Sequence, residues 1–497
     1  MEDKFYITTT IPYANAPPHI GFALEIIQAD ILARWNTLHK KKVFFLTGTD
    51  EHGTKNYQTA KKQKLTPQEF VDKNSELFKE LTKALNISNN YFIRTTDKKR
   101  HWPGAIEMWR ILKERGDIYK KKYSGKYCSG CERFITEKEL EDNKCPEHPS
   151  LNIQQIEEEN YFFRLSKYSD KIKKLIETNK LEILPEKWKN DFLGLIKNGL
   201  TDVSFSRDIK HLPWGIPVPE DKNQVLYVWC DALTNYLTGI GFPNKKYEKF
   251  WPADIHLVGK DMLRFHAGIW PGMLLSAGLQ LPKKIIVHGF LTIDGKKMSK
   301  STGNVISPLE LAKKYSSDSI RYYLTRTTPF GDDGDFSEKA LMERHNNELA
   351  NKLGNLVSRV STLAEKYGIE KCENELALKN LISDWKSKKI ENSRLSTIKE
   401  HFKNYELDRA LSEIFAFLDI CNEYIQKTQP WKSKDKKILY ELADSIKSAS
   451  ILLWPFIPET SEKIANVFGF KISISELNNP LKISKIKKSE ILFNKIK

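Results

Sequence analysis

Long hydrophobic runs are absent from this sequence of 497 residues. A helix that crosses a bilayer needs about 18 or more consecutive apolar residues. The longest candidates, near Ile451–Ile457 and Ile285–Ile293, are interrupted by Pro, His or Gly. The chain also opens with acidic residues and runs directly into a strand-like stretch, whereas a signal or transit peptide needs a basic start. We therefore expect a cytoplasmic protein that makes no contact with membranes.

Cysteine is scarce, with six residues in the whole chain, of which Cys230, Cys372 and Cys421 are scattered. So few cysteines cannot form a disulfide scaffold in a chain of this length, which indicates a reducing compartment. The 21 prolines and 24 glycines are not in excess, and 40% of the residues are hydrophobic. This composition excludes a disordered or low-complexity protein, and the length suits roughly two to four domains.

Acidic residues are in deficit. The 64 Asp and Glu residues face 80 Lys and Arg residues, which gives a formal net charge of +16. One explanation is a polyanionic partner such as nucleic acid. The other is a lysine-rich composition without functional meaning, and composition alone does not decide between the two.

The first fifty residues have the pattern of strand, loop, helix and second strand. Phe5–Ile11 is rich in aromatic and β-branched residues, and a turn-rich loop follows it up to Pro18. From His19 onward, apolar residues recur at the spacings of an amphipathic helix, at Ile20, Leu24, Ile27, Ile31 and Trp35. A second apolar run, Val43–Leu46, leads into another loop. This order predicts a Rossmann-type parallel α/β sheet that binds ligands at the carboxyl ends of its strands.

The remainder of the chain predicts an insertion and a helical region. Residues 116–222 interrupt the α/β pattern with a cysteine cluster, charge-rich stretches and an irregular Pro/Gly segment. We expect this insertion to separate the two halves of the α/β domain, residues 1–115 and 223–336. Residues 337–497 have helical periodicity and few glycines, which predicts an all-α bundle with a short C-terminal tail.

Two short motifs have the chemistry of a nucleotide site. His19-Ile20-Gly21-Phe22 opens a helix after a Pro-rich loop, where free N–H groups and the helix dipole attract phosphate. Lys297-Met298-Ser299-Lys300-Ser301 offers two mobile ammonium groups flanked by hydroxyls, which suits phosphates. A plain helix start and a solvated basic turn would explain either motif alone, but the two in this order are highly specific.

A third motif has the spacing of a structural zinc site. Cys128-x2-Cys131-x13-Cys145-x2-His148 brings two close pairs of ligands together across a short loop. Four protein ligands leave no position for water, so the zinc would be structural and not catalytic. The alternative is three unrelated thiols and a surface histidine.

Further segments accompany these motifs along nearly the whole chain: Ile11–Asn15, Thr49–Gly53, Trp214–Pro219, Tyr227–Ala232, Val258–Asp261, Phe265-His266 with Trp270, Asn355–Arg359, and Pro430-Trp431. Together they resemble the class I aminoacyl-tRNA synthetases, and among them the methionyl-tRNA synthetases. One departure concerns the first motif, which in this family usually ends in a second histidine where this chain has Phe22. That difference leaves the phosphate contacts of Phe22 open, while His19, Gly21 and both lysines are retained.

The resemblance implies a two-step reaction. Methionine and ATP would give methionyl-adenylate and pyrophosphate, and the methionyl group would then pass to the 3′ end of initiator and elongator methionine tRNA. His19, Lys297 and Lys300 would be catalytic by stabilising charge on the phosphates, with Mg²⁺ accompanying ATP. The same resemblance implies an ATP site formed by His19, Gly21, Phe22, Lys297, Ser299, Lys300 and Ser301.

The family likeness also implies a methionine pocket with an aromatic wall. Ile11 through its backbone and Tyr236 through its hydroxyl would lie near the thioether sulfur, and Asp50 would hold the ammonium group. The rest of the wall would be Tyr13, Trp229, Ala232, Phe265, His266 and Trp270. Each aromatic residue taken alone would be assigned to core packing. A polar contact to sulfur matters because apolar fit separates similar side chains by only about 1–3 kcal/mol.

The resemblance assigns the helical region to anticodon binding. Trp431 could stack on an unpaired base, and Asn355 and Arg359, four residues apart, could contact the edge of that base. A buried position in the bundle core is an equal alternative for Trp431. The zinc-bearing insertion would support the region that faces the tRNA acceptor end. The short C-terminal segment is similar to that of family members without an appended domain, so we expect a monomer.

Three alternatives to this prediction need separate consideration. Class I synthetases for leucine, isoleucine and valine carry a large editing insertion, which the distance from His19 to Lys297 does not accommodate. A cysteine enzyme would bind its substrate thiol with zinc, whereas this zinc motif is fully occupied by protein. The last alternative is a non-catalytic tRNA-binding paralogue in which Phe22 marks a decayed site, and the intact Lys297–Ser301 motif disfavours it.

Overall fold

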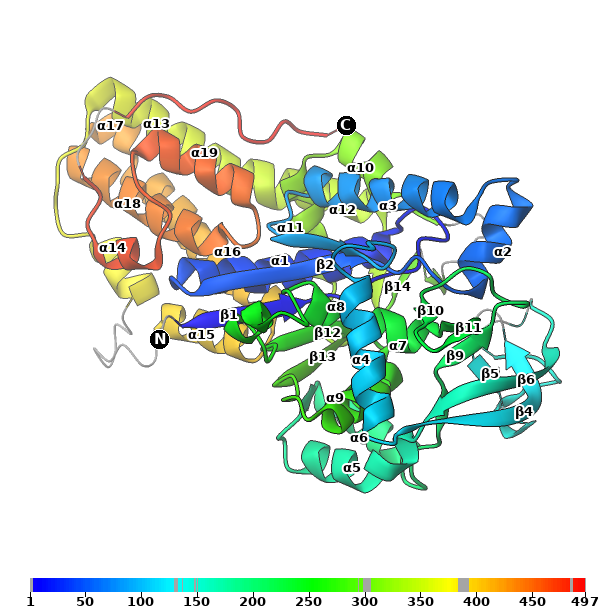
Figure 1. Ribbon diagram of the computed structural model, residues 1–497. Helices are drawn as coiled ribbons and strands as arrows, with labels where there is room; N and C mark the ends of the chain where they lie inside the picture. Colours follow the sequence, from blue (N-terminus) through cyan, green and yellow to red (C-terminus); the bar gives the residue numbers. More distant parts are fainter. Residues whose placement is uncertain are drawn as a thin grey trace.

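A six-stranded parallel sheet forms the centre of the molecule (Figure 1). The computed structural model describes residues 3–128, 133–135, 137–146, 149, 151–293, 295–297, 305–382, 393–482 and 486–496. The strand order is β3-β2-β1-β12-β13-β7. The bounds are β1 Lys4–Thr8, β2 Lys42–Thr49, β3 Tyr91–Arg94, β7 Glu182–Leu184, β12 Ile255–Gly259 and β13 Lys284–His288. This sheet confirms the predicted Rossmann-type architecture.

The two faces of the sheet belong to two different cores. Successive side chains on a strand point to opposite faces. On β1, Phe5 and Ile7 enter one core and Tyr6 enters the other. Helix α1 (Ile20–Leu38) and helix α11 (Ser317–Thr327) cover the first face. The second face is covered by α4 (Trp102–Glu114) and α9 (Trp270–Ala277).

The order of the strands places the candidate site. Strand β1 pairs with β2 on one side and with β12 on the other. The strands of the first half of the domain are added outward from β1 on one side, and β12 and β13 are added on the opposite side, so the direction of strand addition reverses at β1. In parallel α/β sheets ligands bind beyond the carboxyl ends of the strands at this kind of reversal. The loops that follow β1, β2, β12 and β13 all start at that edge. Helices α2 (Thr54–Lys62) and α3 (Pro67–Ala84) follow β2.

The segment predicted as an insertion forms most of two smaller antiparallel sheets, of which β11 continues past residue 222, and it also contributes to the central sheet. One small sheet has the order β5-β4-β6-β8 and the other β10-β11-β9. Strand β7, which lies inside residues 116–222, is the edge strand of the central sheet next to β13. The domain boundaries remain predictions. The bounds are β4 Ile118–Cys128, β5 Arg133–Ile135, β6 Gln154–Phe163, α5 Ser169–Glu177, α6 Glu186–Leu195, β8 Val203–Ser204, β9 Ser206–Asp208, β10 Pro217–Val218 and β11 Asp221–Leu226.

A short three-stranded sheet carries the first lysine of the Lys297–Ser301 motif. Its order is β15-β14-β16, with β14 Leu291–Ile293, β15 Lys296–Lys297 and β16 Gly334–Phe336. Lys297 pairs with Thr292 in the antiparallel part of this sheet. Helix α10 (Pro308–Lys314) follows the motif. Met298, Ser299, Lys300 and Ser301 lie outside the described residues.

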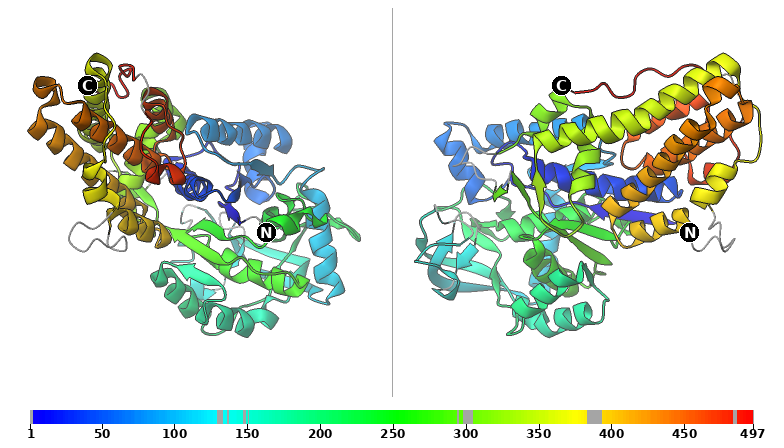
Figure 2. Two further views of the ribbon diagram at one scale, coloured as in Figure 1. Left: turned by 90° about the vertical axis from the view of Figure 1, so that its left-hand side faces the viewer. Right: turned by 180° about the vertical axis from the view of Figure 1, so that it is seen from behind.

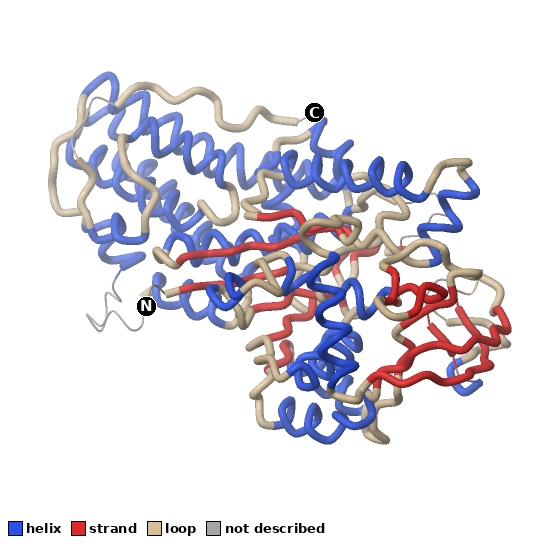
Figure 3. Tube along the Cα trace, viewed as in Figure 1, coloured by secondary structure: helices blue, strands red, loops and turns tan. Residues whose placement is uncertain are grey.

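The C-terminal third is helical, as the sequence predicts (Figures 2 and 3). Its helices are α12 Glu338–Arg344, α13 Asn355–Tyr367, α14 Glu375–Ala377, α15 Arg394–Lys403, α16 Leu407–Thr428, α17 Pro430–Ser433, α18 Lys436–Leu453 and α19 Pro458–Phe468, with the π-helix His345–Gly354 between α12 and α13. One continuous apolar core joins this bundle to α1 and the sheet.

Buried charges connect the bundle to α1. Arg321 on α11 is fully buried, lies 2.7 Å from the Asp30 carboxylate of α1, and donates to the carbonyls of Pro455 and Phe456 between α18 and α19. The C-terminal segment runs back along the bundle (Figure 1), where His345 lies 2.8 Å from the carbonyl of Asn494. In the part of the chain that the structure describes, no helix is both long and apolar enough to cross a membrane.

Candidate active site

An aromatic cluster occupies the place of the predicted methionine pocket, in segments that follow the carboxyl ends of β1 and β12. Helices α7 (Val228–Leu233) and α8 (Asn235–Thr238) supply one wall, and the π-helix Phe265–Ile269 supplies another. The rings of Trp229 and Phe265 stack with centroids 3.6 Å apart and planes 13° apart. One apolar cluster contains most of the predicted methionine-binding residues, namely Ile11, Tyr13, Trp229, Ala232, Tyr236, Phe265 and Trp270.

His266 joins this pocket through the hydroxyl of Tyr236. Nδ1 of His266 lies 2.9 Å from the carbonyl of Met262, and because a carbonyl only accepts, Nδ1 carries the proton. Burial lowers the pKa of His266 to about 4, so the ring is neutral and its Nε2 is an acceptor. Tyr236 therefore donates its hydroxyl proton to this Nε2 across 2.6 Å. The proton predicted to face the thioether is thus engaged by His266.

A second buried histidine, His256 on β12, supports the same pocket and was missed by sequence reasoning. The indole Nε1 of Trp270 donates to its Nε2 across 3.1 Å, so Nδ1 carries the proton and bonds the hydroxyl of Thr8 at 2.7 Å. The ring of Tyr236 lies 4.4 Å from that of His256. Burial lowers the pKa of His256, which keeps it neutral. The signal in the sequence was a histidine within an otherwise apolar strand.

Asp50 lies at the end of β2 and faces the loop that carries Tyr13. The two residues form a parallel β-bridge, with Asp50 N–H donating to the carbonyl of Pro12 and Ala14 N–H donating to the carbonyl of Asp50, both at 2.9 Å. Asp50 is buried. Burial, the charge of Glu25 and the charge of Asp50 raise the pKa of Tyr236, so Asp50 lies electrostatically close to the aromatic pocket.

A buried carboxylate ties the loop of Asp50 to the aromatic wall. Asp231, two residues after Trp229, lies 2.6 Å from Nδ1 of His52 and 2.7 Å from Nε2 of His101. Burial alone would raise the pKa of Asp231, but the two histidines more than compensate and the pKa is lowered. Sequence reasoning missed this trio, because nothing in the sequence pairs residues so far apart.

The first nucleotide motif forms the start of α1. His19 is the N-cap, and its Nδ1 accepts the N–H of Gly21 at 3.1 Å. The ring of Phe22 is buried and packs edge-on against Phe78, with centroids 5.2 Å apart. The ATP contact of Phe22 stays a prediction, and its ring forms part of the apolar core under α1. The N–H of Ile20 donates to the carbonyl of Ile306, which brings the chain after the lysine-serine motif to the start of α1.

Glu25, on α1, connects the segment after β1 to the end of β13 and was not predicted. Its Oε1 accepts the N–H and the hydroxyl of Thr10, both at 2.6 Å. Its Oε2 lies 2.9 Å from Nε2 of His288 at the end of β13. Burial alone would lower the pKa of His288, but its bond to Glu25 more than compensates and the pKa is raised. The helix that begins with His19 is thus fixed to the strand that leads into Lys297.

A separate cavity of about 380 Å³ opens on the helical bundle. Arg359 and Trp431 line it together with Ser358, Thr362, Leu363 and Gln426. Trp431 is 37% exposed, so the alternative of a buried core position is wrong. Asn355 is exposed one turn before Arg359 on α13 and is not among the lining residues.

Two of the four predicted zinc ligands lie together in the insertion. Cys128 ends β4, and both it and Cys145 are buried in a small cluster with Ile135. Cys131 and His148 lie outside the described residues. Among the residues that are described, no group of three or more His, Cys, Asp or Glu side chains could hold a metal ion.

Comparison with known families identifies both regions of the chain. The model described as “tRNA synthetases class I (M)” matches residues 5–154 and 150–361, and “Anticodon-binding domain of tRNA ligase” matches residues 389–497. A methionine–tRNA ligase of Caldanaerobacter subterraneus is 42% identical over 100% of this chain and 79% of its own length. That of Brucella suis is 41% identical over 94% of this chain and 92% of its own.

Solved structures agree with these matches. The methionyl-tRNA synthetase of Mycobacterium tuberculosis in complex with methionyl-adenylate has a TM-score of 0.91 and 37% identity over 99% of both chains. The free form of that enzyme has a TM-score of 0.84 and 35% identity, covering 100% of this chain and 99% of the other. The chain therefore belongs to the class I aminoacyl-tRNA synthetases and, within them, to the methionine–tRNA ligases.

Proposed function

We propose that this chain activates L-methionine with ATP to methionyl-adenylate and pyrophosphate and then transfers methionine to the 3′ end of methionine tRNA. The observation that carries this proposal is the apolar cluster that contains Trp229, Phe265 and Tyr236, with the charge of Asp50 acting on Tyr236 at the reversal point of the sheet. Aromatic rings and a carboxylate are the groups that a thioether side chain and an ammonium group need. Phosphoryl chemistry of this kind asks the protein for positioning and charge stabilisation.

The proposed roles divide between the two sides of the site. Asp50 binds the substrate ammonium, the aromatic wall encloses the side chain, and the N–H of Ile11 faces the sulfur. His266 orients the hydroxyl of Tyr236. On the nucleotide side, the start of α1 with His19 and Gly21 binds phosphate, and Lys297 and Lys300 stabilise the charge on the leaving pyrophosphate. Ser299 and Ser301 would contribute hydroxyls to the same phosphates.

Two metals accompany this proposal. Mg²⁺ would arrive with ATP, held by phosphate oxygens, and would neutralise charge during the transfer. Zinc would be held by Cys128, Cys131, Cys145 and His148, and the common burial of Cys128 and Cys145 fits a thiolate-rich structural site. Zinc would fix the loops of the insertion, which we expect to face the tRNA acceptor end. A cytoplasmic monomer remains a prediction.

The bundle cavity supports anticodon recognition. The exposed Trp431 and Arg359 line the same cavity, where the ring can stack on an unpaired base and the guanidinium can hydrogen-bond it. Asn355, on the same helix, would contact the edge of that base.

Amino-acid-dependent exchange between pyrophosphate and ATP tests the proposal, with methionine compared against leucine, isoleucine, valine and cysteine. Exchange with methionine alone would support both the activation step and the pocket. Exchange with none of the five, by a folded protein that still binds methionine tRNA, would leave a non-catalytic tRNA-binding paralogue.

A further inference from the structure

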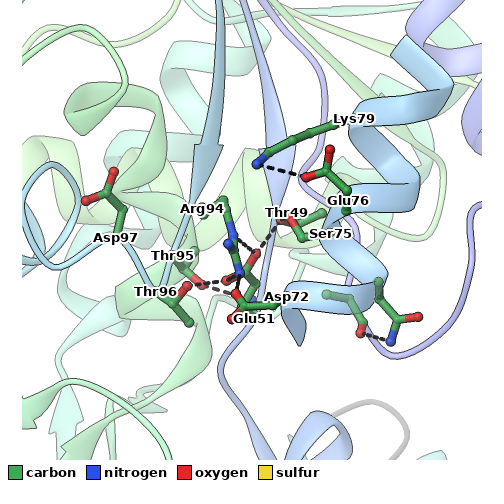
Figure 4. Close-up of polar contacts among 12 residues, drawn as sticks. Thr49, Glu51, Asp72, Ser75, Glu76, Lys79, Arg94, Thr95, Thr96 and Asp97 are labelled. Atoms are coloured by element: carbon green, nitrogen blue, oxygen red, sulfur yellow. Dashed lines mark hydrogen bonds and ion pairs between the residues drawn. The ribbon is translucent and has the colours of Figure 1, made fainter. Parts of the chain in front are cut away.

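The residue after Asp50, Glu51, is a fully buried carboxylate held by one arginine (Figure 4). Its Oε1 accepts Nε of Arg94 at 2.6 Å and the hydroxyl of Thr49 at 2.7 Å. Its Oε2 accepts Nη2 of Arg94 at 2.9 Å and the hydroxyl of Thr96. This is a two-pronged arginine–carboxylate pair with every acceptor oxygen engaged.

The backbone of Glu51 is fixed as well. Its N–H donates to the hydroxyl of Thr95 at 2.9 Å, and its carbonyl accepts the indole N–H of Trp214 at 2.8 Å. Thr95 and Arg94 are neighbours at the end of β3, so β3 clamps the end of β2 from the side. The clamp leaves little freedom to the peptide that links Asp50 to Glu51.

The side chains of Asp50 and Glu51 point to opposite sides of the chain, because the two residues are consecutive in an extended segment. Side chains alternate between the faces of a strand. Glu51 turns to Arg94, whereas Asp50 bridges to Tyr13 and its charge reaches Tyr236 in the aromatic pocket.

Two adjacent buried carboxylates would compete for one positively charged substrate. Burial opposes the charge of Arg94, but its hydrogen bonds to Glu51 and Asp72 raise its pKa above the ordinary value. Arg94 is therefore a permanent cation that offsets the buried charge of Glu51, and it also pairs with the half-exposed carboxylate of Asp72. Without Arg94, the buried negative charge of Glu51 would lie one residue from Asp50 and would attract the ammonium group away from Asp50.

We propose that Arg94 and Glu51 are positioning residues for the ammonium group of the amino acid, and that their pairing commits this group to Asp50. The proposal rests on the proposed function, since it takes Asp50 as the ammonium ligand. Arg94 and Glu51 need not touch methionine. They hold the Asp50 backbone and remove the competing charge.

Two methionine analogues isolate this role. Methioninol keeps the ammonium group and lacks the carboxylate, whereas 4-(methylthio)butanoate keeps the carboxylate and lacks the ammonium group. Arg94→Met should weaken inhibition by methioninol about tenfold, and leave inhibition by 4-(methylthio)butanoate within about twofold. Exchange assays should give a raised KM for methionine with an unchanged KM for ATP.

A double variant separates the charge effect from damage to the fold. Arg94→Met leaves Glu51 buried without its cation, and adding Glu51→Gln removes that charge. Glu51→Gln/Arg94→Met should recover methioninol binding to within about threefold of the parent protein. The matched control is Lys79→Met, which breaks an exposed ion pair with Glu76 on the neighbouring helix α3 (Figure 4). This variant should leave inhibition by both analogues unchanged.

Equal weakening of both analogues by Arg94→Met would overturn the proposal, and so would a folded double variant that fails to recover methioninol binding. Failure of the proposed function would look different. In that case the unsubstituted protein itself would bind neither analogue and would not exchange pyrophosphate with methionine.

Discussion

Tyr236 Oη and His266 Nε2 lie 2.6 Å apart in the aromatic pocket, and the proton between them belongs to the tyrosine. Since His266 is neutral and its other nitrogen donates to the carbonyl of Met262, Nε2 can only accept. A hydroxyl has a single proton, so Tyr236 cannot also donate to a thioether in this arrangement. Of the two polar contacts to sulfur that the family likeness implies, this arrangement leaves the backbone of Ile11 as the proposed one.

Tyr236→Phe tests the assignment of the Tyr236 hydroxyl proton to His266. The variant should lose about 1–3 kcal/mol in the free energy of unfolding, because Nε2 of His266 is left buried without a donor. Discrimination between methionine and norleucine should change less than about threefold, since norleucine differs only in lacking the sulfur. Urea unfolding and pyrophosphate exchange with both amino acids measure the two quantities. A tenfold loss of discrimination would show that the hydroxyl turns to the sulfur when methionine binds.

Trp431→Ala tests the bundle cavity. Stacking of a base on an aromatic side chain contributes about 1–3 kcal/mol, so kcat/KM for aminoacylation of methionine tRNA should fall by about 5- to 150-fold. Pyrophosphate exchange without tRNA should not change, because the cavity is lined by residues of the helical bundle and by none of the aromatic residues of the α/β domain. Ile491→Ala, at a 74% exposed apolar residue, is the matched control and should alter neither assay. An equal loss of exchange in Trp431→Ala would point to a folding defect instead of lost stacking.

Local patterns in the sequence predicted the start of the fold well. The apolar spacing after His19 predicts a helix, and α1 extends over Ile20–Leu38. Its polar positions were less informative, because Asp30 looks like a solvent-facing residue. In the folded protein Asp30 is buried against Arg321, nearly three hundred residues away, and no local pattern reveals such a partner. The edge strand β7 was hidden for the same reason, since only pairing with β13 makes it part of the central sheet.

The candidate site was likewise predicted only in part from the sequence. The aromatic wall was found because its residues match a family pattern, and the structure brings Trp229, Phe265 and Tyr236 together. The groups that hold the wall in place, His256 and Asp231, carry no motif of their own. Their roles depend on burial and on partners from other elements, which the sequence does not display.

Cys145→Ser tests the zinc motif. The wild-type chain should contain one zinc ion by elemental analysis, and the variant should lose it because a serine hydroxyl is a poor ligand for structural zinc. Cys372→Ser removes a cysteine outside the motif and should keep the full metal content. A wild-type protein purified without chelators that contains no zinc would contradict the prediction.

The pKa of His266 gives the protein a defined response to acid. Burial lowers this pKa to about 4 from an ordinary 6.5, so the unfolded chain binds more protons than the folded chain between those values. The contribution of His266 to stability is therefore complete above pH 6.5 and is lost as the pH falls toward 4. A shift of this size corresponds to about 3 kcal/mol in the free energy of unfolding.

His266→Gln should flatten that acid limb while keeping a side chain that can accept the Tyr236 hydroxyl. The measurement is the free energy of unfolding from urea titrations at several values between pH 4 and 7, for the variant and the parent protein. His211→Gln, at a histidine whose side chain is 58% exposed, should reproduce the parent curve. Identical slopes for His266→Gln and the parent protein would mean that His266 is not held neutral. The assignment of the Tyr236 proton would then fail as well, because a charged imidazolium has no acceptor nitrogen.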